Sequence, residues 1–553
     1  MRYLRLRLRS SIFLGLSITT FFSLTTLHLF LRSTRELEQK DSTILTESKP
    51  IYSFLEQSNP DNFKAIPSQK LNKHKEYISS ERVDELYRLI LANRNDQSNS
   101  FHSSWTLGKI LSEQSQIQRN DTNTHKNETT DSRDLKEQPF QFQLNLTTTL
   151  KNFNENDKTQ LRYFIHHILS KWKNDHQNDT IVSLADIMQE DLAQNDPQRL
   201  KTTWYRYIKT VTNSRVYNPN SPEFKYLLNH LQNGAISEAS EMSQGTQIKL
   251  ILQLSDGFQS LLKPYRVPRN YQTFPDHFYF SDIERHHAEI AAFHVDKLLG
   301  FNRVPPLIGR LLNITSDLRD KATEELRKTF FLSPANNTCF RGHCTYYCDT
   351  SHAVCGKPGN RLEGSVQLLL PRPPEVDWQK ITHPYRRSYS ATRQAEWETN
   401  ENYCYEHVII DEDYHNRLLL DMMDLCAFDF LIGNLDRHHM MRISSFGINT
   451  ALIHLDNGRS FGRHDSDDLS ILAPIRQCCF FRYSTFTRLY RLYRKGLSKL
   501  LSNSLNIGEQ LPMILIKEHL IAIDRRLEIL FAHLDTCIQT YTVKGVMIDD
   551  GVD

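Results

Sequence analysis

The chain has 553 residues, of which 39% are hydrophobic and 24% are charged, and its formal net charge is +2. This composition is typical of a globular protein with enough chain for two to four domains. A net charge so close to zero argues against a nucleic-acid-binding protein, which usually carries a strongly basic domain. All the cysteines lie between Cys339 and Cys537, so a long cysteine-free part precedes a cysteine-bearing part.

The N-terminus has the features of a signal anchor. Residues 1–10 carry several arginines and no acid, and residues 11–31 carry no Lys, Arg, Asp or Glu. As a helix the second segment rises about 30 Å, enough to cross a bilayer, and the arginines predict a cytoplasmic tail over 1–10. The alternative is a cleaved signal peptide, which would have a shorter apolar region and an A-x-A-like site. We therefore predict a single-pass type II anchor at 11–31 and a lumenal remainder.

Residues 32–194 are rich in Asn, Gln, Ser, Thr and Lys, which is typical of a partly disordered stem. Apolar residues at helical spacing within 83–90 and 161–169 predict two amphipathic helices that pack on the domain that follows. Asn-x-Ser/Thr glycosylation sites agree with a lumenal chain. These sites are Asn120, Asn127, Asn145, Asn178, Asn313 and Asn336.

A folded domain is predicted over 195–545. Alternating apolar residues over 246–254 predict a strand, and a Ser-Asp-Gly turn leads from it into a second strand over 258–263. Residues 281–300 have the pattern of a helix. Its cap would be Ser281 or Asp282, and a glycine follows its last turn.

Further along the chain the elements become mainly helical. Residues 418–434 are a continuous apolar helix, and residues 450–456 predict a buried strand. The tail, 484–540, is mostly helical. Strands that precede helices in this way predict an α+β enzyme with a small β-rich N-lobe and a large helical C-lobe that carries the disulfides.

The cysteines favour disulfides over a zinc site. Four of them lie within residues 339–355, but their spacing is not the paired C-x2-C of zinc ligands, and a lumenal compartment is oxidising. Cys478 and Cys479 are adjacent, so each needs a separate distant partner, for which Cys404 and Cys537 are the candidates. Cys426 lies inside the apolar helix, where a buried free thiol is expected.

Four charged residues follow the order found in kinases. Asp436 stands in a loop before the predicted strand 450–456, and Asp456 ends that strand just before a glycine. In a kinase the first acid orients or deprotonates the attacking hydroxyl, and the second holds the metal on the nucleotide phosphates. Upstream, Lys263 ends a strand and Glu284 falls on the next predicted helix, where a lysine–glutamate pair binds phosphate and metal.

Other interpretations of these residues remain open at this point. A loop Asp is usually a turn former, a Lys at a strand end is usually solvated, and Glu289 competes with Glu284. The sequence has no H-R-D, D-F-G or G-x-G-x-x-G motif. A metal hydrolase is the rival, but adjacent histidines do not share one face of a helix or strand and chelate poorly. Its ligands would be His286, His287, His438 and His439.

Several longer motifs carry a family resemblance. FYFSDIERHHAEIAAFH, FFLSPANNTCF, DFLIGNLDRHH and LIHLDNGRSFG resemble the secretory-pathway kinase family, which includes the Golgi casein kinase, the glycosaminoglycan xylosylkinase and, more distantly, Four-jointed. The resemblance covers about 240–540 and is closest to the Golgi casein kinase, whereas GSV and SILAP look more like the xylosylkinase. It implies an atypical two-lobed kinase fold, ATP as the nucleotide, and Mn²⁺, with Mg²⁺ as a substitute, as the metal, which suits all-oxygen ligation.

The resemblance also implies roles for single residues. Asp436 matches the catalytic acid, and Glu284 and Asp456 match the metal ligands. The implied nucleotide contacts are Gln247, Lys249, Lys263, Glu284 and Asp456, with Leu368, Leu369, Leu370 and Pro371 as the hinge that cradles adenine. The implied disulfides are Cys339–Cys355, Cys344–Cys348, Cys404–Cys478 and Cys479–Cys537, which leaves Cys426 free. Asn313 matches a glycosylation position of the family.

One departure from the family pattern concerns the catalytic loop. The family has a Glu five residues after the catalytic Asp, and this chain has Met441, a poor ligand for Mn²⁺. The sequence therefore leaves three hypotheses. The match to the Golgi casein kinase favours a Golgi protein kinase acting on Ser-x-Glu sites of secreted proteins, and GSV and SILAP favour a xylose kinase of proteoglycan linkers. Met441 favours a pseudokinase that activates a relative. The expected location is the Golgi membrane. Secretion after cleavage of the stem and a homo- or heterodimer with a family member are alternatives that the sequence leaves open.

Overall fold

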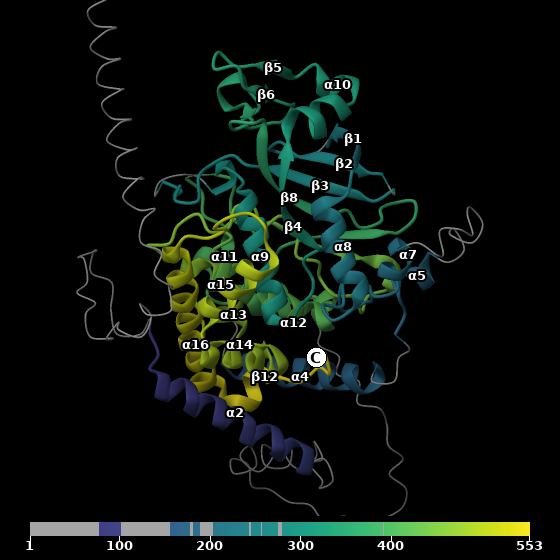
Figure 1. Ribbon diagram of the computed structural model, residues 1–553. Helices are drawn as coiled ribbons and strands as arrows, with labels where there is room; N and C mark the ends of the chain where they lie inside the picture. Colours follow the sequence, from purple (N-terminus) through teal and green to yellow (C-terminus); the bar gives the residue numbers. More distant parts are fainter. Residues whose placement is uncertain are drawn as a thin grey trace, which may run out of the picture. The chain divides into compact units, whose positions relative to one another are not determined.

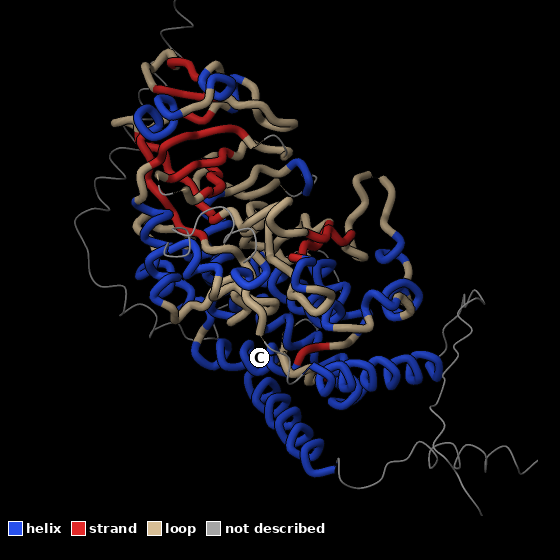
Figure 2. Tube along the Cα trace, turned by 90° about the vertical axis from the view of Figure 1, so that its right-hand side faces the viewer, coloured by secondary structure: helices blue, strands red, loops and turns tan. Residues whose placement is uncertain are grey.

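The computed structural model describes residues 77–100, 155–176, 181–188 and 203–552, apart from 243–244, 256, 275–278 and 391. The described residues belong to one compact unit, 73–553. Within it, strands gather at one end and helices at the other (Figures 1 and 2). The expected two-lobed α+β architecture is confirmed.

The small lobe is built on a five-stranded antiparallel sheet with the order β1-β2-β3-β8-β4. The predicted hairpin is present, but its first strand begins at Leu250 instead of residue 246. Lys263 of β3 pairs with Ser365 of β8, so the lysine stands in the middle of the sheet. The strands are β1 (Ile236–Glu241), β2 (Leu250–Leu254), β3 (Gln259–Pro264), β4 (Leu307–Asn313) and β8 (Arg361–Leu368).

A disulfide-bonded insertion lies between β4 and β8. It holds α10 (Glu324–Arg327) and a three-stranded sheet of β5 (Phe330–Leu332), β6 (Thr338–Phe340) and β7 (Val354–Cys355). Cys339–Cys355 and Cys344–Cys348 are bonded within it. The prediction that the disulfides belong to the large lobe is therefore wrong for these two, because the chain returns to the small-lobe sheet as β8 after the last of these cysteines.

Helix α9 (His286–Leu299) begins later than the predicted 281–300 and ends, as expected, where Gly300 adopts a left-handed φ of 70°. Asp282 does not cap it, because its Oδ2 accepts hydrogen bonds from Arg285 and Thr273 instead. Glu284 therefore lies before the helix and not on it, which corrects the sequence-based placement.

The large lobe surrounds α12 (Arg417–Ile432), a buried helix that ends at Gly433 as predicted. The predicted strand 450–456 is wrong: only Ile453 forms a bridge, to Met441. The neighbouring amides of Ala451 and His454 donate to carbonyls of loops instead. The strands here are β9 (Trp378–Thr382), β10 (His439–Ile443), β11 (Phe481–Arg482) and β12 (Met547–Ile548). The helices here are α11 (Glu396–Thr399), α13 (Ala473–Cys478), α14 (Tyr483–Lys495), α15 (Leu497–Gly508) and α16 (Lys517–Val546). Before the small-lobe sheet in the sequence come α5 (Leu184–Ile187), α7 (Thr203–Ile208) and α8 (Pro222–Asn233), and α8 packs on β4 and β8.

The two helices predicted in the stem are present as α2 (Ser80–Ser100) and α4 (Glu155–His176), and both pack on the large lobe (Figure 1). Buried Arg162 of α4 donates to the carbonyl oxygens of Cys478, Cys479 and Gly545. The compact unit thus extends well upstream of the boundary expected at residue 195.

Two further disulfides, Cys404–Cys478 and Cys479–Cys537, fasten the large lobe, and Cys426 is free and buried. All four bonds are the pairs that the resemblance implies. Among the potential glycosylation sites, Asn336 is exposed and Asn313 half-buried, and the other four lie outside the described residues. The anchor predicted at 11–31 also lies outside them. No helix in the described part of the chain is long and apolar enough to span a membrane.

Candidate active site

Lys263 lies at the centre of a cluster of charges. Its Nζ lies 2.9 Å from Glu284 Oε2 and 3.2 Å from Asp456 Oδ1, and it also pairs with Glu289 in the first turn of α9. Lys249, just before β2, places its Nζ 3.1 Å from Asp456 Oδ1 and 3.6 Å from Glu284 Oε1. The structure therefore brings these sequence-predicted groups together from distant parts of the chain.

The charges in this cluster stabilise one another. Burial alone would raise the pKa of Glu284, but the ammonium groups of Lys249 and Lys263 outweigh it and lower that pKa to about 2. Lys249 and Lys263 likewise hold the pKa of Asp456 well below its usual range. Burial opposes the charge on Lys263, yet Glu284, Glu289 and Asp456 raise its pKa well above the usual value. The acids are therefore ionised and the lysine is protonated at neutral pH.

The carboxylates of Glu284 and Asp456 fit a divalent metal. Both lie within 3.2 Å of one ammonium nitrogen, so they converge on a common point of positive charge. Carboxylate oxygens are the ligands that Mn²⁺ and Mg²⁺ prefer. In the part of the chain that the structure describes, no three His, Cys, Asp or Glu side chains form a metal site. Nucleotide phosphates and water would have to supply the remaining ligands, as is usual for such metals.

A tight turn presents Asp456 to the cluster. Asp456 has a left-handed φ of 52°, which aspartate tolerates better than most residues. Two residues later, a Cβ on Gly458 would lie 3.1 Å from the Cβ of Glu284. The carbonyl of Gly458 accepts a hydrogen bond from the Arg285 amide at 2.7 Å. The glycine thus allows the turn to pack directly against the segment that holds Glu284.

Asp436 lies in the loop that follows α12. Its amide donates to Asn434 Oδ1 at 3.1 Å, and its Oδ2 accepts from Arg459, while the buried Oδ1 has no hydrogen-bond partner. His438 Nδ1 lies 3.5 Å from this Oδ1 without a hydrogen bond between them, so the oxygen can still accept one from a substrate hydroxyl. Arg437 joins this loop to the Asp456 turn, because it donates to Asn457 Oδ1 at 2.8 Å.

Arg459 is a residue that the sequence reasoning missed. Besides Asp436, its guanidinium donates to Thr246 Oγ1 at 3.1 Å and to the Asp282 carbonyl at 3.2 Å. It therefore connects the catalytic loop to two small-lobe segments. Its position three residues after Asp456 was visible in the sequence, but only the fold shows that it reaches Asp436.

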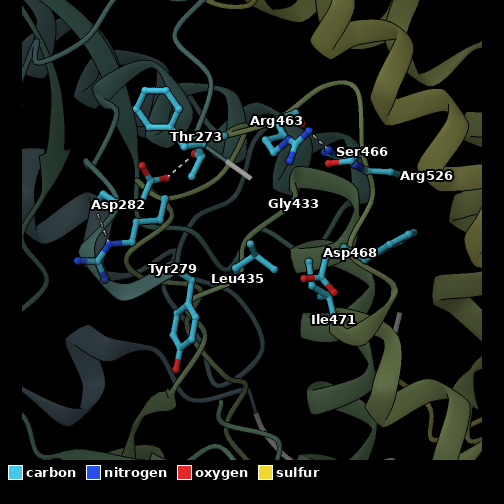
Figure 3. Close-up of a pocket in the computed structure, with 14 residues that line it drawn as sticks. Thr273, Tyr279, Asp282, Gly433, Leu435, Arg463, Ser466, Asp468, Ile471 and Arg526 are labelled. Carbon is cyan, nitrogen blue, oxygen red and sulfur yellow. Dashed lines mark hydrogen bonds between the residues drawn. The ribbon is translucent and has the colours of Figure 1, made fainter. Parts of the chain in front are cut away.

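A cavity of about 160 Å³ lies beside Asp436 (Figure 3). Its lining includes Leu435 and Arg459, the neighbour and the partner of Asp436. Tyr279 and Asp282 of the small lobe lie on one side, and Arg463 lies on the opposite side, next to Ser466 and Arg526. The cavity thus adjoins the catalytic loop, although neither Asp436 nor the Lys263 cluster lines it.

The family resemblance implies that Gln247 contacts the nucleotide, but its side chain forms hydrogen bonds within the protein. Its Nε2 donates to the Asp282 carbonyl at 2.6 Å, and its Oε1 accepts from the Glu284 amide at 2.9 Å. Both ends of this buried amide are therefore used inside the protein, so Gln247 supports Glu284 in this structure.

Residues 368–371 begin with the last residue of β8 and continue towards the large lobe, which is the place expected for the hinge. Leu368 and Leu370 are buried. The amide of Leu369 donates to the Gln259 carbonyl at 3.0 Å, and the carbonyl of Pro371 accepts from Trp378 Nε1 at 2.8 Å. Two of the polar backbone groups of this segment are therefore already used inside the protein.

The histidines do not form a rival metal site. His286 and His287 are buried next to each other in α9, and His286 Nε2 lies 3.6 Å from Oε2 of Glu363. Burial lowers the pKa of His286 to about 4 and that of His439 to about 4. A carboxylate thus lies near each pair, Glu363 beside His286 and Asp436 with its Oδ1 3.5 Å from His438 Nδ1. Neither set forms a group that could hold a metal ion in the described residues, so the hydrolase alternative has no structural support.

Met441 lies in β10, opposite Lys380 of β9, and its carbonyl accepts from the Ile453 amide at 2.8 Å. Arg442, the next residue, donates to Gln379 Oε1 and to the Ile448 carbonyl. Its guanidinium is therefore engaged away from the charged cluster and does not replace the missing acid.

The lysine, the carboxylates and the catalytic-loop aspartate, held between a β-rich and a helical lobe, define a protein-kinase-like phosphotransfer site. The family model "Golgi casein kinase, C-terminal, Fam20" matches residues 202–546, and the chain belongs to the Fam20 family.

Individual relatives agree with this assignment. The human "Extracellular serine/threonine protein kinase FAM20C" is 43% identical over 350 residues, which are 63% of this chain and 60% of the relative's length. The human "Pseudokinase FAM20A" is 37% identical over 388 residues, 66% of this chain and 71% of the relative. A crystal structure of "the Golgi casein kinase with Mn/ADP bound" superposes with a TM-score of 0.63 at 38% identity, over 75% of this chain and 96% of that one.

Proposed function

We propose that the chain is a kinase of the secretory pathway that transfers the γ-phosphate of ATP to serine in Ser-x-Glu sites of secreted proteins. The observation that carries the proposal is the convergence of Lys263, Glu284 and Asp456 beside a loop that holds Asp436. The similarity to a human extracellular serine/threonine kinase favours a protein acceptor.

Each residue of the site has a separate role in the proposed reaction. Lys263 and Lys249 neutralise phosphate oxygens, and Leu368, Leu369, Leu370 and Pro371 cover the adenine. Glu284 and Asp456 hold Mn²⁺, or Mg²⁺ in its place, and the metal when bound neutralises charge on the phosphates. Asp436 orients the acceptor hydroxyl and takes its proton through Oδ1, the oxygen that Arg459 leaves free.

The site of action follows from the N-terminus and the disulfides. We place the protein in the Golgi membrane as a single-pass type II protein with tail 1–10, anchor 11–31, stem 32–194 and catalytic domain 195–545. Cleavage in the stem would release a secreted enzyme, and pairing with a second family member would give a dimer. The four disulfides are consistent with an oxidising compartment.

Met441 favours a second candidate, a pseudokinase that activates a relative. The side chain stands where the family has a Glu, and a thioether does not bind Mn²⁺ well. One of the relatives is itself named a pseudokinase. The protein would then bind nucleotide and partner without transferring phosphate.

The acceptor class can be tested directly. The purified chain is incubated with radiolabelled ATP and Mn²⁺ and with a Ser-x-Glu peptide, its Ala-x-Glu control, or a xylose-containing linker glycan. Labelling of the serine peptide alone supports the proposal. Labelling of the glycan alone would make the protein a xylose kinase. Labelling of neither acceptor would favour the second candidate, a pseudokinase.

A further inference from the structure

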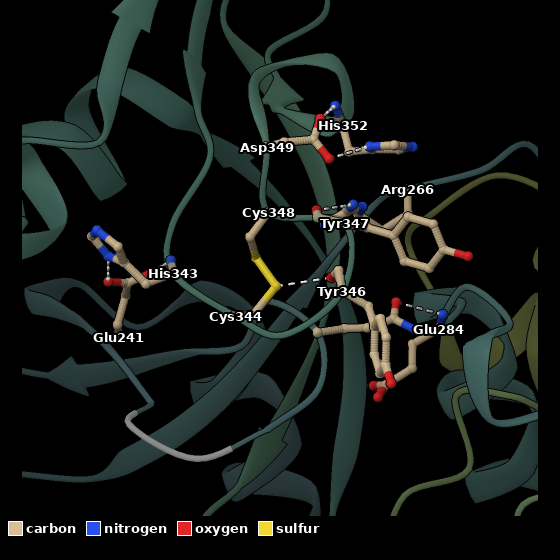
Figure 4. Close-up of a disulfide and its surroundings, with 11 residues drawn as sticks. Glu241, Arg266, Glu284, His343, Cys344, Tyr346, Tyr347, Cys348, Asp349 and His352 are labelled. Carbon is tan, nitrogen blue, oxygen red and sulfur yellow. Dashed lines mark hydrogen bonds and ion pairs between the residues drawn. A yellow bond between two sulfur atoms is a disulfide. The ribbon is translucent and has the colours of Figure 1, made fainter. Parts of the chain in front are cut away.

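The Cys344–Cys348 loop of the insertion reaches the segments that form the active site (Figure 4). The amide of Tyr346 donates to the Thr246 carbonyl at 2.8 Å. The hydroxyl of Tyr347 donates to the Ser281 carbonyl at 2.6 Å. One short disulfide-closed loop thus contacts both the segment before β2 and the segment before α9.

Side chains from other segments fix the backbone of the segment that precedes α9. Glu284 precedes the first helical residue, so no helical hydrogen bond of α9 fixes its backbone. The Gln247 side chain holds its amide at 2.9 Å and the Asp282 carbonyl at 2.6 Å. Upstream, the Tyr347 hydroxyl holds the carbonyl of Ser281. Glu284 is therefore placed by side chains from other parts of the chain.

Tyr347 itself is held from several sides. It has a left-handed φ of 64°, which a bulky residue adopts only where its surroundings fix it. Its carbonyl accepts from Arg266 at 2.8 Å, its ring packs edge-on against His352, and Cys348 is the next residue. An unusual backbone conformation that aims a hydroxyl at an active-site segment points to a role in that site.

We propose that Tyr347 is a positioning residue for Glu284, and that the Cys344–Cys348 disulfide keeps Tyr347 in the conformation that this role needs. The inference rests on the proposed function in one respect, the role of Glu284 as a metal ligand. Without the Tyr347 hydroxyl, the Ser281 carbonyl is released and the segment that ends at Glu284 loses one of its upstream restraints. Asp282 stays bonded to Thr273 and Arg285. The affinity for metal then falls, whereas Asp436 remains paired with Arg459.

The test is Tyr347→Phe in the full chain, which removes one hydroxyl and keeps the ring. We expect the Mn²⁺ concentration for half-maximal ADP binding, followed by a fluorescent ADP analogue, to rise about tenfold, as for other groups that orient a metal ligand. At saturating Mn²⁺ the kcat should stay within twofold of wild type. Tyr226→Phe, at an exposed position of α8, is the matched control and should change neither quantity.

A double variant, Cys344→Ser with Cys348→Ser, should move the half-saturating Mn²⁺ concentration in the same direction. A shift below twofold in Tyr347→Phe, or a loss of kcat and melting temperature with no shift, would overturn the inference. If the wild-type chain binds Mn²⁺–ADP but transfers no phosphate, the proposed function fails, while a shifted binding curve in Tyr347→Phe still supports the positioning role. A wild-type chain that shows no Mn²⁺-dependent ADP binding would overturn both.

Discussion

The two ends of the active site differ in how their charges are balanced. At the small-lobe end, Lys263 and Lys249 are matched by Glu284, Glu289 and Asp456. At the catalytic-loop end, Asp436 faces Arg459 and His438. There the family's glutamate is replaced by Met441. The groups proposed to bind metal and phosphate thus lie next to a catalytic loop that lacks one acid of the family pattern, and the predictions below separate the two ends.

The largest effect is expected for Asp456→Asn. The substitution removes a metal ligand, so we expect kcat to fall about 10³-fold, as is typical for the loss of a charged group at a phosphotransfer site. The fold should survive, because the Asp456 side chain is 56% exposed. Asp465→Asn, in the segment that follows, is the control. Activity of Asp456→Asn within tenfold of wild type would show that the metal is held elsewhere.

Lys263→Met should lower both activity and stability. Glu289 is only 2% exposed and pairs with this lysine, so the substitution leaves a buried carboxylate unpaired, at about 3 kcal/mol in the free energy of unfolding. The double variant with Glu289→Gln should regain much of the stability but none of the activity. Urea unfolding and phosphate transfer are measured for the single and the double variant. Equal stability of the two variants would show that the buried Lys263–Glu289 pair does not stabilise the fold.

Met441→Glu tests whether the missing acid of the catalytic loop limits phosphate transfer. If the lost acid limits the reaction, the new carboxylate should raise kcat/KM for ATP about tenfold, because a charged ligand binds the metal where a thioether does not. Met441→Gln has nearly the same size without the charge and should stay close to wild type. Equal rates for the two variants would mean that the catalytic loop works with Asp436 alone.

Acidic pH is expected to lower the stability of the fold while it leaves the charges of the Lys263 cluster unchanged. Burial lowers the pKa of His286 to about 4 and the pKa values of His383 and His519 to about 3. Below about pH 6.5 the unfolded chain binds protons at these residues and the folded chain does not. Stability therefore falls as the pH drops from 6.5 towards the folded-state values, by up to about 1.4 kcal/mol per unit for each histidine. A melting temperature that is the same at pH 7.5 and 5.5 would contradict this.

The sequence predicts some of these features because their causes are local. The end of α12 at Gly433 and the helical tail follow from apolar periodicity and a left-handed glycine. The kinase order of Lys263, Glu284, Asp436 and Asp456 also leads to groups that the fold brings together. The family resemblance supplies the four disulfide pairs, which spacing alone left open.

Other features depend on tertiary contacts that no local pattern contains. The start of α9 was predicted too early, because Asp282 bonds to Arg285 instead of capping. The strand predicted at 450–456 is absent, because its amides find acceptors in loops. The choice between Glu284 and Glu289 could not be made either, since both contact Lys263, one from before α9 and one from its first turn.

The central claim is that Asp436 works with Glu284 and Asp456 as one phosphotransfer site. Its most direct test is the initial rate of phosphate transfer from ATP to a Ser-x-Glu peptide in Mn²⁺, measured side by side for the wild-type chain and Asp436→Asn. We predict transfer by the wild type at least about 100-fold faster than by the variant. Equal rates in the two proteins, or transfer by neither, would contradict the claim.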